Sequence, residues 1–243
     1  MSKLYITATP IGNLSDISLR AIETLKRVDF ILCEDTRTTA KLLHRFKVNT
    51  PTISYHQHSK LKKVERIVDL LKQGRDVALV SDAGTPGIAD PGGKLVEQVV
   101  RELGSQVEVV AVPGPCALTA AASVSGLPMD RFVFMGFPPA KKKRRKFFQE
   151  VLASKYPVIL YESPHRILKT LTELGALAER GGSDPPQIGE GQTLPGLQVV
   201  LCRELTKLHE TTYRGTPQDI AKKLKTDKIK GEFIIILKPY DRK

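Results

Sequence analysis

The sequence predicts an α/β fold built from two domains. Short apolar strand patterns alternate with amphipathic helix patterns along the first half of the chain, which is typical of a parallel sheet with right-handed crossovers. Several of these strand patterns end in turns rich in Gly and Pro, and a second series of strand patterns starts after a small-residue segment at 114–126. We therefore expect an N-terminal α/β domain at 1–114 and a C-terminal α/β domain at 115–243.

The composition is that of a soluble, folded protein. The chain has 243 residues and an apolar share of 41%, enough for one large or two small domains. No apolar run approaches the roughly 18 residues of a membrane span, and residues 1–11 are too short for a secretory signal, so we expect a cytoplasmic protein. Cys33, Cys116 and Cys202 lie in apolar stretches without C-x-x-C spacing, which favours reduced thiols over disulfides or zinc.

The first half contains five strand patterns, each followed by a helix pattern. The strands are expected at 4–9, 30–33, 52–54, 77–80 and 107–112, where apolar residues run together. The first helix is expected to begin at Ser15, because apolar residues recur at helical spacing from there to Leu25. The next two helices should end near residues 46 and 73, and the last two should span 94–103 and 118–124.

Polar residues gather where the second strand pattern ends. Glu34, Asp35 and Arg37 place two carboxylates and a guanidinium there. Because the carboxyl ends of strands border the ligand crevice of an open α/β sheet, these side chains are candidates for chemistry. Helix capping with internal ion pairing is the alternative, since Asp is a good N-cap residue.

The segment 81–92 is the strongest ligand signal in the chain. It follows an apolar strand, precedes a helix, and is rich in Gly and Pro, which let the backbone turn tightly or approach a ligand closely. The segment has no G-x-G-x-x-G, and Leu95 stands where a Walker A sequence needs Ser or Thr, so NAD and ATP are disfavoured. A nucleotide-like ligand is expected, with an ordinary strand-to-helix turn as the alternative.

His56 and His58 have the alternate spacing that could chelate a metal in a strand. Neither Cys nor a carboxylate accompanies them in a ligand pattern. We therefore expect a loop that faces substrate or solvent, and no metal site.

The second half repeats the alternation of strands and helices. Strand patterns are expected at 131–135, 158–161, 197–202 and 232–237, and helix patterns from the basic run at 141–146 to about 154 and at 167–177. The segment 162–166 again places polar residues at a strand end, where His165 alone could equally be a helix cap. Residues 179–196 are rich in Gly, Pro and Gln, which predicts a mobile loop.

The chain is strongly basic, with a net charge of +12. Six of the positive charges stand together in Lys141–Lys146. Such a run favours contact with nucleic-acid phosphates, although a solvated helix face is the plain alternative. Aromatic residues beside it are few, only Phe147 and Phe148 adjoining, so phosphate contact is favoured over base stacking.

Seven motifs in one order resemble the bacterial ribosomal RNA small subunit methyltransferase I family, a branch of the tetrapyrrole methylase-like, class III S-adenosylmethionine enzymes. They are ATPIGNL, CEDTR, SDAGTPGIADPG, VPGP, YESPHR, CRELTKLHE and GEFIIIL, and together they span nearly the whole chain. Two features depart from that pattern: the loop near 178–195 is longer, and the sequence stops just after its last strand.

The resemblance implies a parallel-sheet N-terminal domain, a mixed-sheet C-terminal domain and S-adenosylmethionine held in a cleft between them, in a homodimer. No metal is expected, because no cluster of metal ligands accompanies the Gly- and Pro-rich loops. The implied reaction is methylation of the ribose 2′-oxygen of a cytidine in the decoding region of small-subunit (16S) ribosomal RNA, free or in the 30S particle. The positions that match cofactor contacts of the wider superfamily are Pro10, Ala83, Gly84, Thr85, Ile88, Cys116, Ala117, Glu162 and Leu205.

For the chemical step, three polar residues at strand ends are candidates. Asp35 and Arg37 come from the first half and Lys207 from the second. We assign them to activation or orientation of the ribose hydroxyl, with Arg37 and Lys207 also able to bind phosphates.

Two other functions remain open. A methylase of the same fold could act on a tetrapyrrole or another small molecule, but the basic run and the CEDTR and YESPHR motifs speak against it. A non-catalytic RNA-binding protein is disfavoured because the Gly and Pro signals sit at strand ends, as a cofactor pocket requires.

Overall fold

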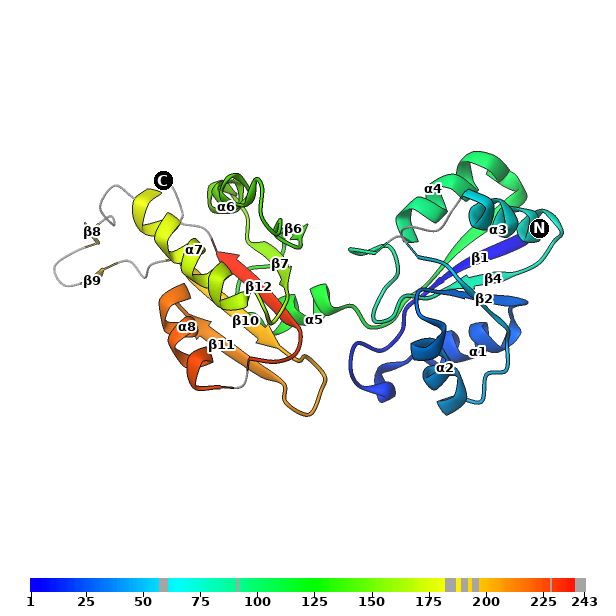
Figure 1. The fold of residues 1–243 in the computed structure, drawn as a ribbon, viewed down its shortest axis with the longest axis horizontal. Helices are drawn as coiled ribbons and strands as arrows, with labels where there is room; N and C mark the ends of the chain where they lie inside the picture. Colours follow the sequence, from blue (N-terminus) through cyan, green and yellow to red (C-terminus); the bar gives the residue numbers. More distant parts are fainter. Residues whose placement is uncertain are drawn as a thin grey trace. The chain divides into compact units, whose positions relative to one another are not determined.

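The computed structural model describes residues 1–56, 61–90, 92–181, 187–188, 192–193, 197–227 and 229–238 (Figure 1). The chain forms two compact units, Met1–Cys116 and Ala117–Lys243. Each unit has a five-stranded sheet and its own helices, so the expected two-domain α/β fold is confirmed. The domain boundary after residue 114 stays a prediction.

The sheet of the first unit is parallel throughout, as expected. Its strand order is β3-β2-β4-β1-β5. The strands are β1 (Ser2–Thr7), β2 (Phe30–Cys33), β3 (Thr52–Ser54), β4 (Val77–Leu79) and β5 (Val107–Val112). Because parallel strands end at the same edge, the loops that follow β1, β2, β4 and β5 all start from one side of this sheet.

Helices cover both faces of this sheet (Figure 1). They are α1 (Leu19–Arg27), α2 (Thr36–Arg45), α3 (Leu61–Lys72) and α4 (Gly92–Leu103), with short 3₁₀ helices η1 (Leu14–Asp16) and η2 (Gly104–Gln106). Tyr5 belongs to the buried cluster of α1 and α2, whereas its neighbour Leu4 belongs to that of α3 and α4. This follows from the alternation of side chains along a strand, and it gives the sheet an apolar layer on each face.

The start of α1 differs from the prediction. Ser15 lies in η1, where its N–H donates to Asn13 Oδ1 at 3.0 Å, and the chain is extended again at Ile17. The N-cap of α1 is Ser18, whose Oγ accepts from Ala21 N–H at 3.1 Å. Asn13 caps the 3₁₀ helix η1 and Ser18 caps α1, each by accepting a hydrogen bond from a backbone N–H of its helix. The α-helix therefore begins after the second of these two caps.

The sheet of the second unit is mixed, as the resemblance implied. Its order is β11-β10-β12-β7-β6; β6 and β7 are parallel and the other neighbours are antiparallel. The strands are β6 (Val133–Gly136), β7 (Val158–Glu162), β10 (Gln198–Arg203), β11 (Thr211–Gly215) and β12 (Phe233–Lys238). Strand β6 forms one edge of this sheet, so the loop that follows it has no further strand of this sheet beside it.

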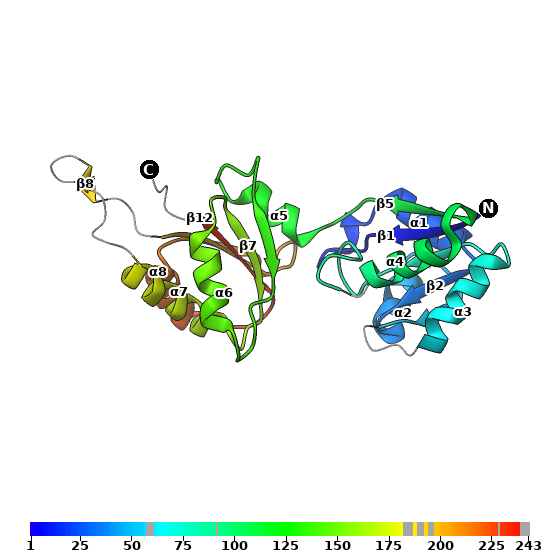
Figure 2. The same ribbon diagram turned by 90° about the horizontal axis from the view of Figure 1, so that it is seen from above.

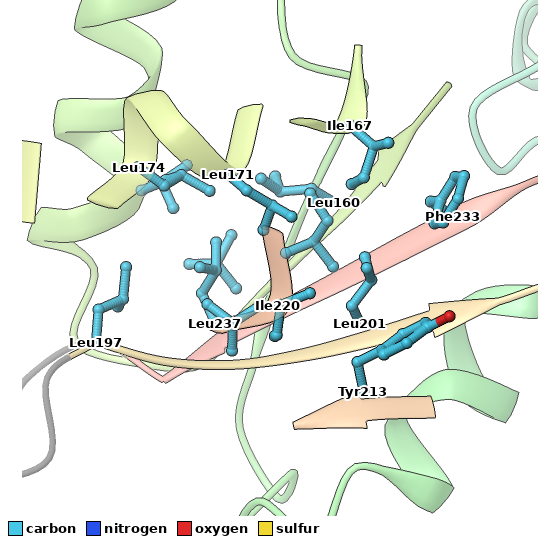
Figure 3. Packing of buried hydrophobic residues seen from close by; sticks show 14 of the residues in the cluster. Leu160, Ile167, Leu171, Leu174, Leu197, Leu201, Tyr213, Ile220, Phe233 and Leu237 are labelled. Carbon is cyan, nitrogen blue, oxygen red and sulfur yellow. The ribbon is translucent and has the colours of Figure 1, made fainter. Parts of the chain in front are cut away.

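Three helices pack on one face of this sheet. They are α6 (Arg144–Ala153), α7 (Ile167–Gly181) and α8 (Pro217–Thr226), whereas α5 (Ala117–Val124) packs against β12 outside their cluster. Figure 2 shows α6 beside β7, and α7 lies against α6. Phe148, Leu171 and Ile220 are fully buried, and Figure 3 shows Leu171 and Ile220 with Leu160 and Leu201 of the strands. Burying each such side chain contributes about 1.5–3 kcal/mol.

Two helices of the second unit have other bounds than predicted. Helix α6 begins only at Arg144, because Lys143 has a left-handed backbone (φ 65°). Helix α7 continues to Gly181, and the two-residue strands β8 (Gln187–Ile188) and β9 (Gln192–Thr193) pair antiparallel. The rest of the predicted loop at 179–196 and His58 lie outside the described residues. Within the described residues, each helix is too short or too polar to cross a bilayer.

Candidate functional site

The loops that follow β1, β4 and β5 are hydrogen-bonded to one another. Thr9 N–H donates to Gly84 O at 2.9 Å, and Gly84 N–H donates to Thr9 O at 3.1 Å. The Thr85 hydroxyl donates to Pro115 O at 3.1 Å. The structure therefore brings together the segments that carry five predicted cofactor residues, which are Pro10, Ala83, Gly84, Thr85 and Cys116.

Gly84 stands where a larger residue does not fit. Its φ is +83°, and a Cβ there would lie 3.2 Å from Ile11 Cγ2 and 3.7 Å from Pro115 O. Nearby, a Cβ on Gly114 would lie 3.0 Å from Ala8 Cβ. Backbone conformation or close approach disfavours a side chain at both positions, and glycine there lets the loops pack closely against one another.

A carboxylate shapes the rest of the glycine loop. Asp90 Oδ1 accepts from Gly87 N–H at 2.7 Å and from Gly92 N–H at 2.8 Å. A Cβ on Gly92 would lie 2.8 Å from Gly87 N, so this turn is also restricted to glycine. Ile88, a predicted cofactor contact, is exposed between them. The sequence motifs assign no role to Asp90, although Asp commonly accepts a backbone N–H two residues on.

Asp35 caps α2 and holds Arg37. Its Oδ1 accepts from the Arg37 backbone N–H at 2.8 Å and from Arg37 Nε at 3.2 Å, and its Oδ2 pairs with Arg37 Nη2 at 3.0 Å. The Asp35 N–H donates to Asp82 Oδ1 at 3.2 Å, which links α2 to the glycine loop. The capping and ion-pairing alternative is thus present in the structure, and the Arg37 side chain remains 89% exposed.

The two carboxylates at the end of β2, Glu34 and Asp35, have pKa values shifted in opposite directions. Hydrogen bonds from the Arg37 side chain and backbone lower the pKa of Asp35 to about 2. Burial and the charges of Asp82 and Asp90 raise the pKa of Glu34. Since a general base works best with a pKa near the operating pH, Asp35 is a weak base and Glu34 the stronger one.

Glu162 ends β7 inside a buried ion-pair network. Its Oε1 accepts from Ser163 N–H at 2.7 Å and pairs with Arg166 Nη2 at 2.9 Å, while its Oε2 accepts from the Thr170 hydroxyl at 2.7 Å. Arg144 Nη2 lies 3.8 Å from the same Oε2. The carboxylate is therefore fully occupied by residues of its own unit, and its predicted contact with a cofactor stays a prediction.

Arg144 belongs to that network and not to the surface. It is 5% exposed, donates to Glu173 and Thr170, and stacks on the Phe148 ring at 4.8 Å. The other members of the basic run, Lys141–Lys143, Arg145 and Lys146, are exposed. The prediction that all six cations could meet phosphates is thus wrong for Arg144, because its charge is neutralised inside the protein.

Lys207 lies in a tight turn between β10 and β11. Its Nζ pairs with Glu204 Oε1 at 2.8 Å and with Glu232 Oε2 at 3.1 Å. Burial alone would lower the pKa of Lys207, but the two carboxylates raise it overall. Lys207 is therefore a cation that can donate hydrogen bonds, and it cannot accept a proton near neutral pH.

The same turn contains a buried polar atom that lacks a partner. Leu205, a predicted cofactor residue, is buried, and the next residue, Thr206, has a left-handed backbone (φ 66°). Among the described residues, the buried Thr206 Oγ1 has no hydrogen-bond partner. Such atoms are uncommon in folded proteins, and this one lies next to a predicted cofactor contact; the buried Ser2 Oγ and Thr7 Oγ1 also lack partners among the described residues.

No group of three or more His, Cys, Asp or Glu side chains is arranged to hold a metal ion within the part of the chain that is described. His56 is described, and His58 is not.

Comparison with known proteins gives the family. The model of the tetrapyrrole (corrin/porphyrin) methylases matches residues 3–221. A protein of Synechocystis named ribosomal RNA small subunit methyltransferase I is 43% identical over 98% of this chain and 79% of its own length. The protein of that name from Thermotoga maritima is 40% identical over 98% of both chains.

The chain belongs to the ribosomal RNA small subunit methyltransferase I family. Its fold is shared more widely. The crystal structure of diphthine synthase superposes with a TM-score of 0.71 over 97% of this chain and 90% of that one, at 14% identity. In this member of the methyltransferase I family, CEDTR contributes the Asp35–Arg37 pair, YESPHR the Glu162–Arg166 pair and CRELTKLHE the Lys207 turn.

Proposed function

We propose that this protein uses S-adenosylmethionine to methylate small-subunit ribosomal RNA at the ribose 2′-oxygen of a cytidine in the decoding region. It would act in the cytoplasm, as a homodimer, on the free RNA or the 30S particle. The observation that carries the proposal is the set of Gly- and Pro-rich loops around Gly84, hydrogen-bonded to one another at the strand ends of a methylase-family fold. The relatives' names support ribosomal RNA as the substrate.

The residues present fit S-adenosylmethionine. Gly84 and Gly114 let the loops at the strand ends pack closely against one another, and Thr206 offers a buried hydroxyl without a partner among the described residues. When bound, S-adenosylmethionine supplies an electrophilic methyl group on a sulfonium. The residues proposed to hold it are Pro10, Ala83, Gly84, Thr85, Ile88, Cys116, Ala117, Glu162 and Leu205.

The chain's own residues would act mainly by positioning the RNA. Asp35 is too weak a base and Lys207 is protonated, so neither accepts the hydroxyl proton efficiently. Asp35 instead orients the exposed guanidinium of Arg37, which with Lys207 can bind phosphate or hydroxyl oxygens. Holding two reactants in the reacting geometry can supply about 7–11 kcal/mol, so this role is sufficient for a large rate effect.

Arg37→Ala and Lys207→Ala should each lower the single-turnover rate of methyl transfer roughly 10- to 100-fold, the value of a charge-assisted hydrogen bond. Asp35→Asn should have a smaller effect, because it acts through Arg37. The rate is measured with labelled S-adenosylmethionine and small-subunit RNA, both saturating. Arg45→Ala, at the other end of α2 and also exposed, is the matched control. If Arg37→Ala, Lys207→Ala and Asp35→Asn all transfer methyl at the wild-type rate, these positioning roles are excluded.

The exposed cations of the basic run should bind RNA phosphates. Replacing Lys141, Lys142 and Lys143 by glutamine should lower the slope of log K against log salt by about 0.7 for each phosphate of single-stranded RNA that is no longer bound. Affinity for S-adenosylmethionine should stay the same. Replacing the exposed Lys222, Lys223 and Lys225 of α8 by glutamine removes the same number of charges and provides the control. An unchanged slope would mean that these lysines form only a solvated face.

A methylase for a tetrapyrrole or another small molecule is the alternative, favoured by the description of the family model. The exposed lysines of the basic run instead favour a polyanionic substrate such as RNA. Mass spectrometry of ribosomal RNA from cells with and without this protein separates the two. Loss of one ribose methyl group is the expected result, and an unaltered RNA would contradict the proposal.

A further inference from the structure

An exposed aromatic side chain lies beside the basic run, in the loop that follows the edge strand β6. Phe137 is 52% exposed, although a phenylalanine normally buries most of its ring. Phe147 and Phe148, which directly follow the run in sequence, are not exposed in this way. Phe148 is fully buried, and Phe147 packs against Phe148 with 5.6 Å between the ring centroids.

Phe137 is the outermost of three aromatic rings that contact one another in a row. Its ring contacts Tyr161 edge to face, with centroids 5.6 Å apart, and Tyr161 contacts Phe134 in the same way at 4.9 Å. Such pairs contribute about 0.5–1.5 kcal/mol beyond buried area. The ring of Phe137 therefore packs against Tyr161 on one side while about half of the residue's surface remains accessible.

The backbone of the loop is fixed by the buried ion-pair network. Arg166 Nη1 donates to Pro138 O and Arg144 Nη1 donates to Pro139 O, both at 3.0 Å. Gly136 and Lys143, at the two ends of the loop, both have left-handed backbones, with φ of 64° and 65°. Both arginines also pair with the buried Glu162 carboxylate, so the loop backbone is bonded to fixed groups of the core.

The same loop carries the three exposed lysines, Lys141, Lys142 and Lys143. Lys141 follows Phe137 by four positions, so their Cα atoms are at most about 14 Å apart. An aromatic ring with an accessible surface beside a row of cations is how proteins bind single-stranded nucleic acid, with bases on the ring and phosphates on the cations.

We infer that Phe137 is a stacking platform for an unpaired RNA base, and that Lys141–Lys143 bind the phosphates beside that base. Arg144 and Arg166 are positioning residues that hold this loop in place. The inference rests on the RNA methylation proposed above and adds a base-contacting residue to it. A double-stranded RNA would not offer its base faces to such a ring, so the partner is single-stranded RNA.

The test measures binding of a fluorescein-labelled oligoadenylate by anisotropy at several salt concentrations. Phe137→Ala should weaken binding about 5- to 150-fold with the salt slope unchanged, because the ring is removed and the lysines still bind phosphates. Phe137→Tyr should bind like the wild type, whereas Phe137→Leu, which keeps apolar surface without an aromatic face, should resemble Phe137→Ala. Val100→Ala, at an apolar residue of α4 that is 50% exposed and has no proposed role in binding, is the control.

The outcomes separate this inference from the proposed function. If the wild type neither binds the oligonucleotide nor methylates ribosomal RNA, the proposed function fails. If the wild type binds and Phe137→Ala binds equally well, only the stacking role is overturned. Sedimentation of each variant gives a further check: if Phe137→Ala turns an oligomer into a monomer, the ring contacts a second copy of the chain and the stacking role is again overturned.

Discussion

Replacing Arg144 by alanine is expected to lower the free energy of unfolding of the second unit by about 3–5 kcal/mol. The guanidinium is 5% exposed and interacts with Glu162, Glu173, Thr170 and the Pro139 carbonyl. Its removal leaves the fully buried Glu162 carboxylate with Arg166 as its one remaining cation among the described residues. It also removes the ring contact with Phe148, so the substitution weakens packing as well as charge pairing.

The next residue provides the control. Arg145 is exposed, and Arg145→Ala should change the free energy of unfolding by no more than about 0.5 kcal/mol. Urea unfolding of the three proteins, followed by circular dichroism, measures the difference. Equal midpoints for Arg144→Ala and Arg145→Ala would show that Arg144 is not a structural member of the network.

Gly84→Val should weaken binding of S-adenosylmethionine by roughly 100-fold, or about 2.7 kcal/mol. Valine would be forced into a left-handed conformation, and its Cβ would press on Ile11 at 3.2 Å, displacing the loops that Thr9 and Gly84 connect. The strain alone costs about 1–2 kcal/mol of stability. Calorimetry with the purified protein measures the affinity, and a chelator should leave wild-type binding unchanged.

A matched substitution at Gly74 separates the effect of backbone strain from the effect on the cofactor loops. The φ of Gly74 is +81°, nearly that of Gly84, but nothing lies within 4 Å of the position of its Cβ. Gly74→Val should therefore lose similar backbone stability and keep full affinity for S-adenosylmethionine. If both variants lose affinity equally, the effect comes from instability of the first unit and not from the glycine loop.

The sequence was most informative where the chain is apolar and repetitive. The strand pattern at 107–112 matches β5 in both bounds, and Gly84 and Gly87 of the Gly-rich segment take left-handed backbones in the tight turns expected there. Asp35 shows the limit of such patterns: a carboxylate at a strand end can cap a helix or act in catalysis, and its pKa of about 2 follows from a contact with Arg37 that only the fold orients.

Arg144 was not recognisable as buried, for a related reason. In sequence it is one of six consecutive cations, and nothing local distinguishes it from Arg145. Its burial depends on Glu162 and Glu173, which are 18 and 29 residues away along the chain. In the same way, Phe137 is one of eight phenylalanines in the sequence, and only the folded structure shows that it is 52% exposed.

The buried clusters divide along the chain as well as in space. Both clusters of the first unit use residues from 4 to 112, and that of the second unit uses residues from 148 to 237. The first unit thus has its complete core before the second has been synthesised, and domains commonly fold in that order as they leave the ribosome. Heating need not then melt the molecule in a single cooperative step, because each half can lose its core at its own temperature.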